Sequence, residues 1–215
     1  MAESPARTAA RILIETESVL FRPDDPFTFT SGRKSPVYVD CRRLISFPNE
    51  RGILMGMMAD QIREAVDVKK VDAIAGGETA GIPFAAWIAD RLGLPMIYIR
   101  KKPKGFGRNA RIEGVINEGD TILLIEDLAT DGGSKMSFIE GIRDAGAECA
   151  HTFVVFHYGI FPKGIKKLNE AGVALHGLTT WWDIIECAEE ENILDAATVA
   201  KVTAFLKDPD GWKAP

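Results

Sequence analysis

The chain has 215 residues, of which 46% are hydrophobic and 27% charged, and its formal net charge is -5. This composition is typical of a globular protein with one well-filled core, and the negative charge argues against nonspecific nucleic-acid binding. No apolar run approaches the length of a membrane span, and the N-terminus lacks a secretory pattern. We therefore expect a cytoplasmic protein with neither nucleic acid nor membrane as a partner. Three widely spaced cysteines, an odd number, indicate reduced thiols: Cys41, Cys149 and Cys187.

The N-terminal residues, to about position 45, predict a small hood. Residues 9–21 (AARILIETESVLF) and 51–66 (RGILMGMMADQIREAV) have helical patterns. Between them, residues 27–42 (FTFTSGRKSPVYVDCR) indicate a hairpin, in which residues 37–39 alternate like an edge strand.

From residue 71 onward, short apolar runs alternate with amphipathic helical patterns. The expected strands cover residues 71–77, 95–100, 121–127, 151–157 and 173–180. The expected helices cover residues 82–93, 134–146, 162–172 and 195–208, with Gly93, Gly146 and Gly172 as left-handed caps. Near-continuous apolar strands separated by helices predict a largely parallel sheet covered on both faces. We expect one α/β domain over residues 1–215.

A basic segment, RKKPKGFGRNAR at residues 100–111, carries six cations and no acid in an otherwise acidic chain. Such a segment is usually a solvated loop. Its glycine and proline content also indicates mobility, and a mobile cationic loop suits a small polyanion.

Two acids and a glycine-rich turn follow the apolar strand in TILLIEDLATDGGSK, residues 121–135. We expect the chain to leave the sheet after Ile125, with Glu126 and Asp127 at the strand mouth. Carboxylates there can accept hydrogen bonds from vicinal hydroxyls or contact hydrated Mg²⁺. The amides of residues 130–134, at the start of a helix, form an anion site. Together these features predict a site for ribose 5-phosphate; the alternative is a plain turn with a serine cap.

Two common phosphate-binding motifs are absent from the sequence. There is no G-x-x-x-x-G-K-[ST] motif, and no G-x-G-x-x-G motif opens a helix. ATPase and dinucleotide-dependent oxidoreductase functions are therefore disfavoured.

Three stretches resemble one enzyme family. LLIEDLATDGGS resembles the phosphoribosyl-pyrophosphate (PRPP) signature of type I phosphoribosyltransferases. The SGRKSP core is similar to the N-terminal orotate-side segment of orotate phosphoribosyltransferases, and IRKKPKGFG resembles their Arg-Lys-x-x-Lys catalytic loop. The stretches occur in the family's order, and the resemblance covers nearly the whole chain. It implies the type I phosphoribosyltransferase fold.

The resemblance also implies an activity and a site. The activity is Mg²⁺-dependent conversion of orotate and PRPP to orotidine 5′-monophosphate and diphosphate, a step of pyrimidine and UMP synthesis. The implied PRPP-binding residues are Arg100, Lys101, Lys104, Glu126, Asp127, Leu128, Ala129, Thr130, Asp131, Gly132, Gly133 and Ser134. We place Lys34, Tyr38 and Thr130 beside orotate, and give catalytic roles to Lys104, Glu126 and Asp127. Mg²⁺ is expected to be held mainly by PRPP and water, with no direct protein ligand. The family is generally dimeric, which implies a homodimer that shares loop 100–111 across its interface.

Strand-end glycines suggest one further contact. Gly76, Gly77 and Glu78, in GGETAG, are placed by hypothesis against the diphosphate; a tight helix-entry turn explains them nearly as well.

Several positions depart from the family pattern. Phe106 replaces a frequent His, Gly105 an Asp, Ala80 a Lys and Thr30 a Lys. VVFHYGIFP, residues 154–162, stands where many members have Asp-Arg-Gln-Glu. These differences predict a divergent subgroup and leave the partner of the orotate carboxylate unassigned.

Two rival functions share the predicted ribose-phosphate site. A purine or xanthine phosphoribosyltransferase is disfavoured by the SGRKSP segment. A non-catalytic PRPP-sensing regulator predicts an added DNA-binding segment, and no basic helix-turn-helix pattern is visible.

Overall fold

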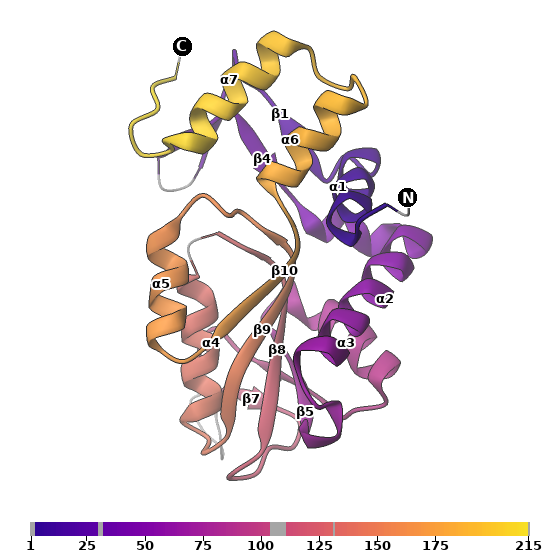
Figure 1. Ribbon diagram of the computed structural model, residues 1–215. Helices are drawn as coiled ribbons and strands as arrows, with labels where there is room; N and C mark the ends of the chain where they lie inside the picture. Colours follow the sequence, from indigo (N-terminus) through magenta and orange to yellow (C-terminus); the bar gives the residue numbers. More distant parts are fainter. Residues whose placement is uncertain (1–2, 30–31, 104–110, 131, 215) are drawn as a thin grey trace.

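The computed structural model describes residues 3–29, 32–103, 111–130 and 132–214. Within these residues, the central sheet has the strand order β10-β9-β8-β5-β6-β7 (Figure 1). All neighbouring pairs are parallel except β6 with β7, which is antiparallel and lies at the edge. The strands are β5 Ala73–Gly77, β6 Met96–Ile99, β7 Ile112–Glu113, β8 Thr121–Ala129, β9 Glu148–His157 and β10 Ala174–Thr180. The expected largely parallel α/β sheet is confirmed.

Helices cover both faces of the sheet, as expected. α2 (Pro48–Ala65) and α3 (Gly81–Leu92) lie on one face, and α4 (Gly133–Arg143) and α5 (Pro162–Glu170) lie on the other (Figure 1). Glycines in the left-handed region follow three of these helices, so the expected caps are confirmed: Gly93 (φ 67°), Gly146 (φ 86°) and Gly172 (φ 70°).

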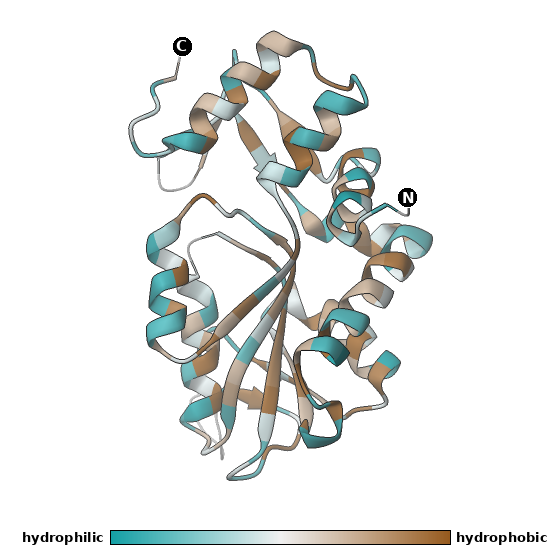
Figure 2. Ribbon diagram, viewed as in Figure 1, coloured by the Kyte–Doolittle hydropathy of each residue, from teal (hydrophilic) through white to brown (hydrophobic). Residues whose placement is uncertain are grey.

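The two faces have separate hydrophobic clusters because successive strand side chains point to opposite sides. Ile74 and Leu123 belong to the cluster that includes α2 and α3, whereas Ala75 and Leu124 belong to the cluster that includes α4. Figure 2 shows the same division, with hydrophobic strands inside and hydrophilic helix surfaces outside. The continuous apolar runs in the sequence follow from this two-sided burial.

The N-terminal hood region contains short antiparallel pairs of strands. Its elements are α1 Pro5–Glu15, β1 Val19–Phe21, β2 Phe27–Thr28, β3 Lys34–Ser35 and β4 Val37–Val39. β2 pairs with β3 and β4 pairs with β1, which confirms the hairpin and the strand at residues 37–39. The expected helix over residues 9–21 is wrong after Glu15. There the backbone turns through Glu17 at φ 52°, and the β-favouring Val19–Phe21 forms a strand.

The C-terminal helices α6 (Trp181–Glu190) and α7 (Ala196–Lys207) lie beside these strands (Figure 1). No helix was expected over residues 181–190. α6 begins with a capping box between Thr180 and Asp183. The buried Trp181 ring lies edge-on to Phe156, with centroids 5.2 Å apart, and so joins α6 to the end of β9. The hood limit near residue 45 and the single-domain assignment stay predictions.

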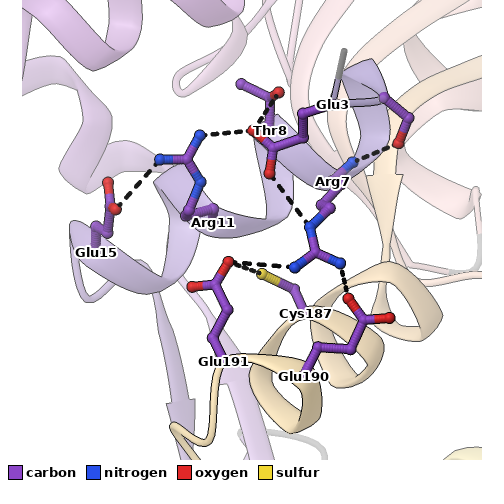
Figure 3. A network of polar contacts seen from close by, with 9 residues as sticks. Glu3, Arg7, Thr8, Arg11, Glu15, Cys187, Glu190 and Glu191 are labelled. Carbon is purple, nitrogen blue, oxygen red and sulfur yellow. Dashed lines mark hydrogen bonds and ion pairs between the residues drawn. The ribbon is translucent and has the colours of Figure 1, made fainter. Parts of the chain in front are cut away.

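Ion pairs hold α1 against α6 (Figure 3). Arg7 contacts Glu3 near its own helix, Glu190 at the end of α6 and Glu191, the residue that caps α6. These partly exposed pairs contribute little individually, but they link the two ends of the chain.

Two short 3-10 helices, Cys41–Ser46 and Val68–Lys70, flank α2. The three cysteines are buried and none of them forms a disulfide, while their reduced state stays a prediction. None of the helices in the described ranges is long and apolar enough to cross a membrane.

Candidate active site

The acidic pair lies inside β8 and not beyond it. The expectation that the chain leaves the sheet after Ile125 is wrong, because Glu126 remains paired with Val154 and the strand continues to Ala129. Consecutive strand side chains point to opposite faces, so the two carboxylates are not side by side. Glu126 and Asp127 are only 5% and 8% exposed.

Glu126 tolerates burial because it has a cationic partner. Lys135 Nζ donates to Glu126 Oε2 at 2.8 Å, and the lysine is itself 4% exposed. Lys135 Nζ also lies 3.2 Å from Ser134 Oγ. Lys135 was not among the predicted site residues. The sequence did contain an indication of this pair. A lysine in the first turn of a helix is disfavoured by the helix dipole, so its presence there predicts a nearby acidic partner.

The strand-end glycines make room for the buried carboxylate. A Cβ at Gly77 or Gly81 would overlap Glu126 Oε1, and one at Gly77 would also overlap the Phe138 ring. A Cβ at Gly76 would lie 2.8 Å from Gly81 O. The tight packing of the turn that enters α3 therefore explains why glycines occur here. Their contact with diphosphate stays a prediction.

The glycine turn after β8 opens α4. Gly132 has φ 76° and is the N-cap, so the amides at the start of α4 are arranged at a helix N-terminus. Substitution of Gly132 is strained by its φ, and a Cβ there would approach Leu168 and Gly164 O of α5 at 3.1 and 3.4 Å. Asp131 lies outside the described residues. Thr130 is exposed at the end of β8, and Ser134 lies in the first turn of α4.

The basic segment is rooted on the antiparallel β6–β7 pair. Arg100 N donates to Arg111 O at 2.7 Å, and Arg111 Nε donates to Arg100 O at 3.2 Å. Lys101 N donates to Glu78 Oε2 at 2.8 Å, which connects the segment to the end of β5. The two ends of the basic segment are therefore held at the carboxyl end of the sheet. Lys104, Gly105 and Phe106 lie outside the described residues.

A cavity of about 1200 Å³ separates the hood from the carboxyl ends of β8 and β9. Five of the predicted site residues line it: Tyr38, Leu128, Thr130, Gly132 and Gly133. Seven other described ones are not part of its lining: Lys34, Arg100, Lys101, Glu126, Asp127, Ala129 and Ser134. Tyr38 contacts Phe29 at a ring separation of 6.2 Å. The glycine turn and an aromatic hood surface thus share one cavity, whose volume fits a small-molecule substrate.

Burial raises the pKa of both acids above its ordinary value, and Lys135 opposes the shift in each case. A raised folded-state pKa means that the folded chain binds more protons than the unfolded chain. The contribution of these acids to the free energy of unfolding is therefore highest below their ordinary pKa. It falls as pH rises through the raised values.

The raised pKa values predict that the unfolding free energy of the unliganded chain depends on pH. We expect Asp127→Asn to flatten the decline in unfolding free energy as pH rises above about 4, the ordinary pKa of aspartate. Urea unfolding at a series of pH values measures this slope. Asp25→Asn, at an exposed carboxyl, is the control. Identical slopes for Asp127→Asn and the parent would contradict the burial effect.

Comparisons with known proteins identify the family. Residues 48–171 match the model of the phosphoribosyl transferase domain. The chain is 57% identical to an orotate phosphoribosyltransferase of Cereibacter sphaeroides (strain KD131) over 211 residues, which cover 98% of this chain and 91% of the relative. It is also 53% identical to that of Roseobacter denitrificans, with coverage of 99% and 94%. The chain belongs to the orotate phosphoribosyltransferase family.

Solved structures agree with this assignment. The orotate phosphoribosyltransferase of Aeropyrum pernix superimposes with a TM-score of 0.71 at 28% identity, covering 86% of this chain and 99% of that one. Leishmania donovani UMP synthase gives a TM-score of 0.78 at 27% identity, covering 94% of this chain and 42% of that chain. The expected type I phosphoribosyltransferase fold and the family resemblance are both confirmed.

Proposed function

We propose that this chain transfers the 5-phosphoribosyl group from PRPP to orotate, giving orotidine 5′-monophosphate and diphosphate for UMP synthesis. One observation carries the proposal. Strand β8 carries both acids, and the Gly132–Gly133 turn at the start of α4 follows it in the chain. This turn lines a cavity whose lining also includes aromatic side chains. The helix N-terminus and the aromatic rings that line this cavity suit a phosphate and a planar base.

The reaction requires little covalent chemistry from the protein. As the bond to diphosphate breaks, positive charge develops on the anomeric carbon and negative charge on the leaving group. The ring nitrogen of orotate is itself the nucleophile. Catalysis is therefore a matter of positioning and electrostatic stabilisation.

Each part of the site has a proposed role. The amides of Gly132, Gly133 and Ser134 bind the 5′-phosphate and fix the sugar through a group remote from the reacting carbon. Glu126 and Asp127 anchor the ribose hydroxyls and favour the cationic sugar. Arg100, Lys101 and Lys104 neutralise the departing diphosphate as their loop closes.

Mg²⁺ is the proposed cofactor. Oxygens of the diphosphate and water would supply its coordination shell, with no direct protein ligand. When bound, the ion neutralises charge on the leaving diphosphate. We expect EDTA to abolish turnover and added Mg²⁺ to restore it.

The assay that tests the proposal follows orotate absorbance after addition of purified protein. We expect a loss of absorbance that needs both PRPP and Mg²⁺. A panel of hypoxanthine, xanthine, guanine and adenine tests the purine alternative, and we expect none to be consumed at a comparable rate. Tight PRPP binding without turnover on any base would instead support the sensing alternative.

We further propose that the chain acts as a cytoplasmic homodimer, with loop 100–111 reaching the partner subunit's site. The described ends of this loop are held by β6, β7 and Glu78. Residues 100–111 carry six cations and no acid. Mixing inactive site variants with inactive loop variants tests the sharing. Recovered turnover in the mixture would support it, and absence of recovery in a verified mixed dimer would contradict it.

A further inference from the structure

Arg33 connects three separate parts of the cavity wall. It belongs to the turn before β3, and its Cζ lies 5.3 Å from the centre of the Phe161 ring. Its Nη2 donates to Asp210 Oδ1 at 2.5 Å, in the segment that follows α7. All three residues line the 1200 Å³ cavity. The guanidinium is thus already placed at the cavity wall by contacts from the hood, the β9–α5 connection and the C-terminal segment.

The surroundings of Arg33 suit a flat anionic ring. Phe29 and Tyr38 of the hood line the cavity, as do Tyr158 and Phe161, whose rings stack with centroids 6.1 Å apart. Burial raises the pKa of the Tyr158 hydroxyl, so this group stays a neutral hydrogen-bond donor at physiological pH. Aromatic faces and neutral donors match a pyrimidine ring.

The other lining cations lie elsewhere in the fold. Lys163 and Lys167 belong to α5, whose Gly164 packs against the Gly132 turn and therefore lies on the phosphate side. Lys207 ends α7. Arg33 differs from these lysines because its guanidinium lies over an aromatic ring of the cavity lining, that of Phe161.

We propose that Arg33 binds the carboxylate of orotate and so determines the preference for this base. The inference rests on the proposed function. Asp210 presents to Arg33 the same chemical group that orotate carries, and the guanidinium donates to this carboxylate within the cavity lining. The two side chains are 41% and 68% exposed. Exposed pairs of this kind are weak, so orotate can replace Asp210. Asp210 therefore occupies the guanidinium until the base binds and competes with the carboxylate of orotate for it.

Steady-state kinetics with orotate and with uracil tests the proposal, because uracil lacks the carboxylate. We expect Arg33→Gln to raise the KM for orotate about tenfold or more, the loss of a charge-assisted hydrogen bond. The ratio of kcat/KM for orotate over that for uracil should fall by the same factor, while the KM for PRPP changes little. Arg33→Lys should recover part of the ratio, because it keeps the charge without the planar fork.

Asp210→Asn provides an independent test that leaves Arg33 intact. Removal of the competing carboxylate should lower the KM for orotate by about two- to fivefold. The matched controls are Arg22→Gln and Asp25→Asn. Arg22 also lies over an aromatic ring, 4.8 Å from the centre of Phe27, and pairs with Asp25, but neither residue lines the cavity. We expect both control variants to keep the parent's orotate-to-uracil ratio.

The outcomes separate this inference from the proposed function. If the parent consumes orotate but Arg33→Gln keeps its orotate-to-uracil ratio, the role of Arg33 is refuted and the proposed function stands. An Asp210→Asn variant with an unchanged or higher KM for orotate refutes the exchange of carboxylates. If the parent does not consume orotate with PRPP, both proposals fail.

Discussion

Lys104→Ala is expected to lower kcat by about 10²–10³-fold, the cost of removing one preorganised donor from a developing anion. The diphosphate gains additional negative charge as the glycosidic bond breaks, so a lysine that contacts it binds it more strongly in the transition state. The KM for orotate should change far less, because orotate carries no part of that charge. Initial rates at saturating PRPP, with orotate varied, measure both constants.

A matched substitution separates this role from a loss of overall charge. Lys166→Ala also removes one lysine, at an exposed position on α5 that does not line the cavity. We expect it to keep parental kinetics. Parental turnover by Lys104→Ala would refute the role of the loop lysine, and so would a loss seen only in the KM for orotate.

Lys135→Met is expected to destabilise the folded chain by about 3–5 kcal/mol at neutral pH, the typical cost of leaving one member of a buried ion pair unpaired. The side chains of Lys135 and Glu126 are only 5% and 7% exposed, so water cannot replace the missing ammonium. Lys135 opposes the burial-driven rise in the pKa of Glu126, and its removal should raise that pKa further. Urea unfolding, followed by tryptophan fluorescence, measures the loss.

The double variant Glu126→Gln with Lys135→Met is the internal control. It removes both charges, so it should be more stable than Lys135→Met alone, and its loss of unfolding free energy should be smaller than the sum of the two single losses. The deficit of Lys135→Met should also shrink as pH falls, because protonation of Glu126 removes the buried charge. Additive effects of the two single substitutions would contradict the buried pair.

The sheet and its helices were predictable because their signals are local. Buried parallel strands require continuous apolar runs, and Gly93, Gly146 and Gly172 mark helix ends through their backbone freedom. Val19–Phe21 was harder to assign, since its strand exists only through pairing with Val37–Val39, a contact distant in sequence. The helix 181–190 is fixed by a capping box and by the burial of Trp181, and the second of these is a tertiary property.

The residue types of the candidate site could be read from the sequence, whereas its geometry could not, and the roles of these residues stay predictions. The residue types around Glu126 and Gly132 indicated a sugar phosphate because few other ligands need both acids and a glycine turn. That β8 would continue through the acids depended on the partner strand β9 and on neutralisation by Lys135, nine residues away. The contact of Arg33 with Asp210 joins positions 177 residues apart, and a single sequence carries no signal for it.

The most direct test of the account is a crystal structure of the protein soaked with PRPP and Mg²⁺. We expect the ribose hydroxyls to lie within hydrogen-bond distance of Glu126 or Asp127, and the 5′-phosphate to accept hydrogen bonds from the amides of Gly132, Gly133 and Ser134. Bound PRPP with its phosphate away from the start of α4, and its ribose touching neither acid, would contradict the account.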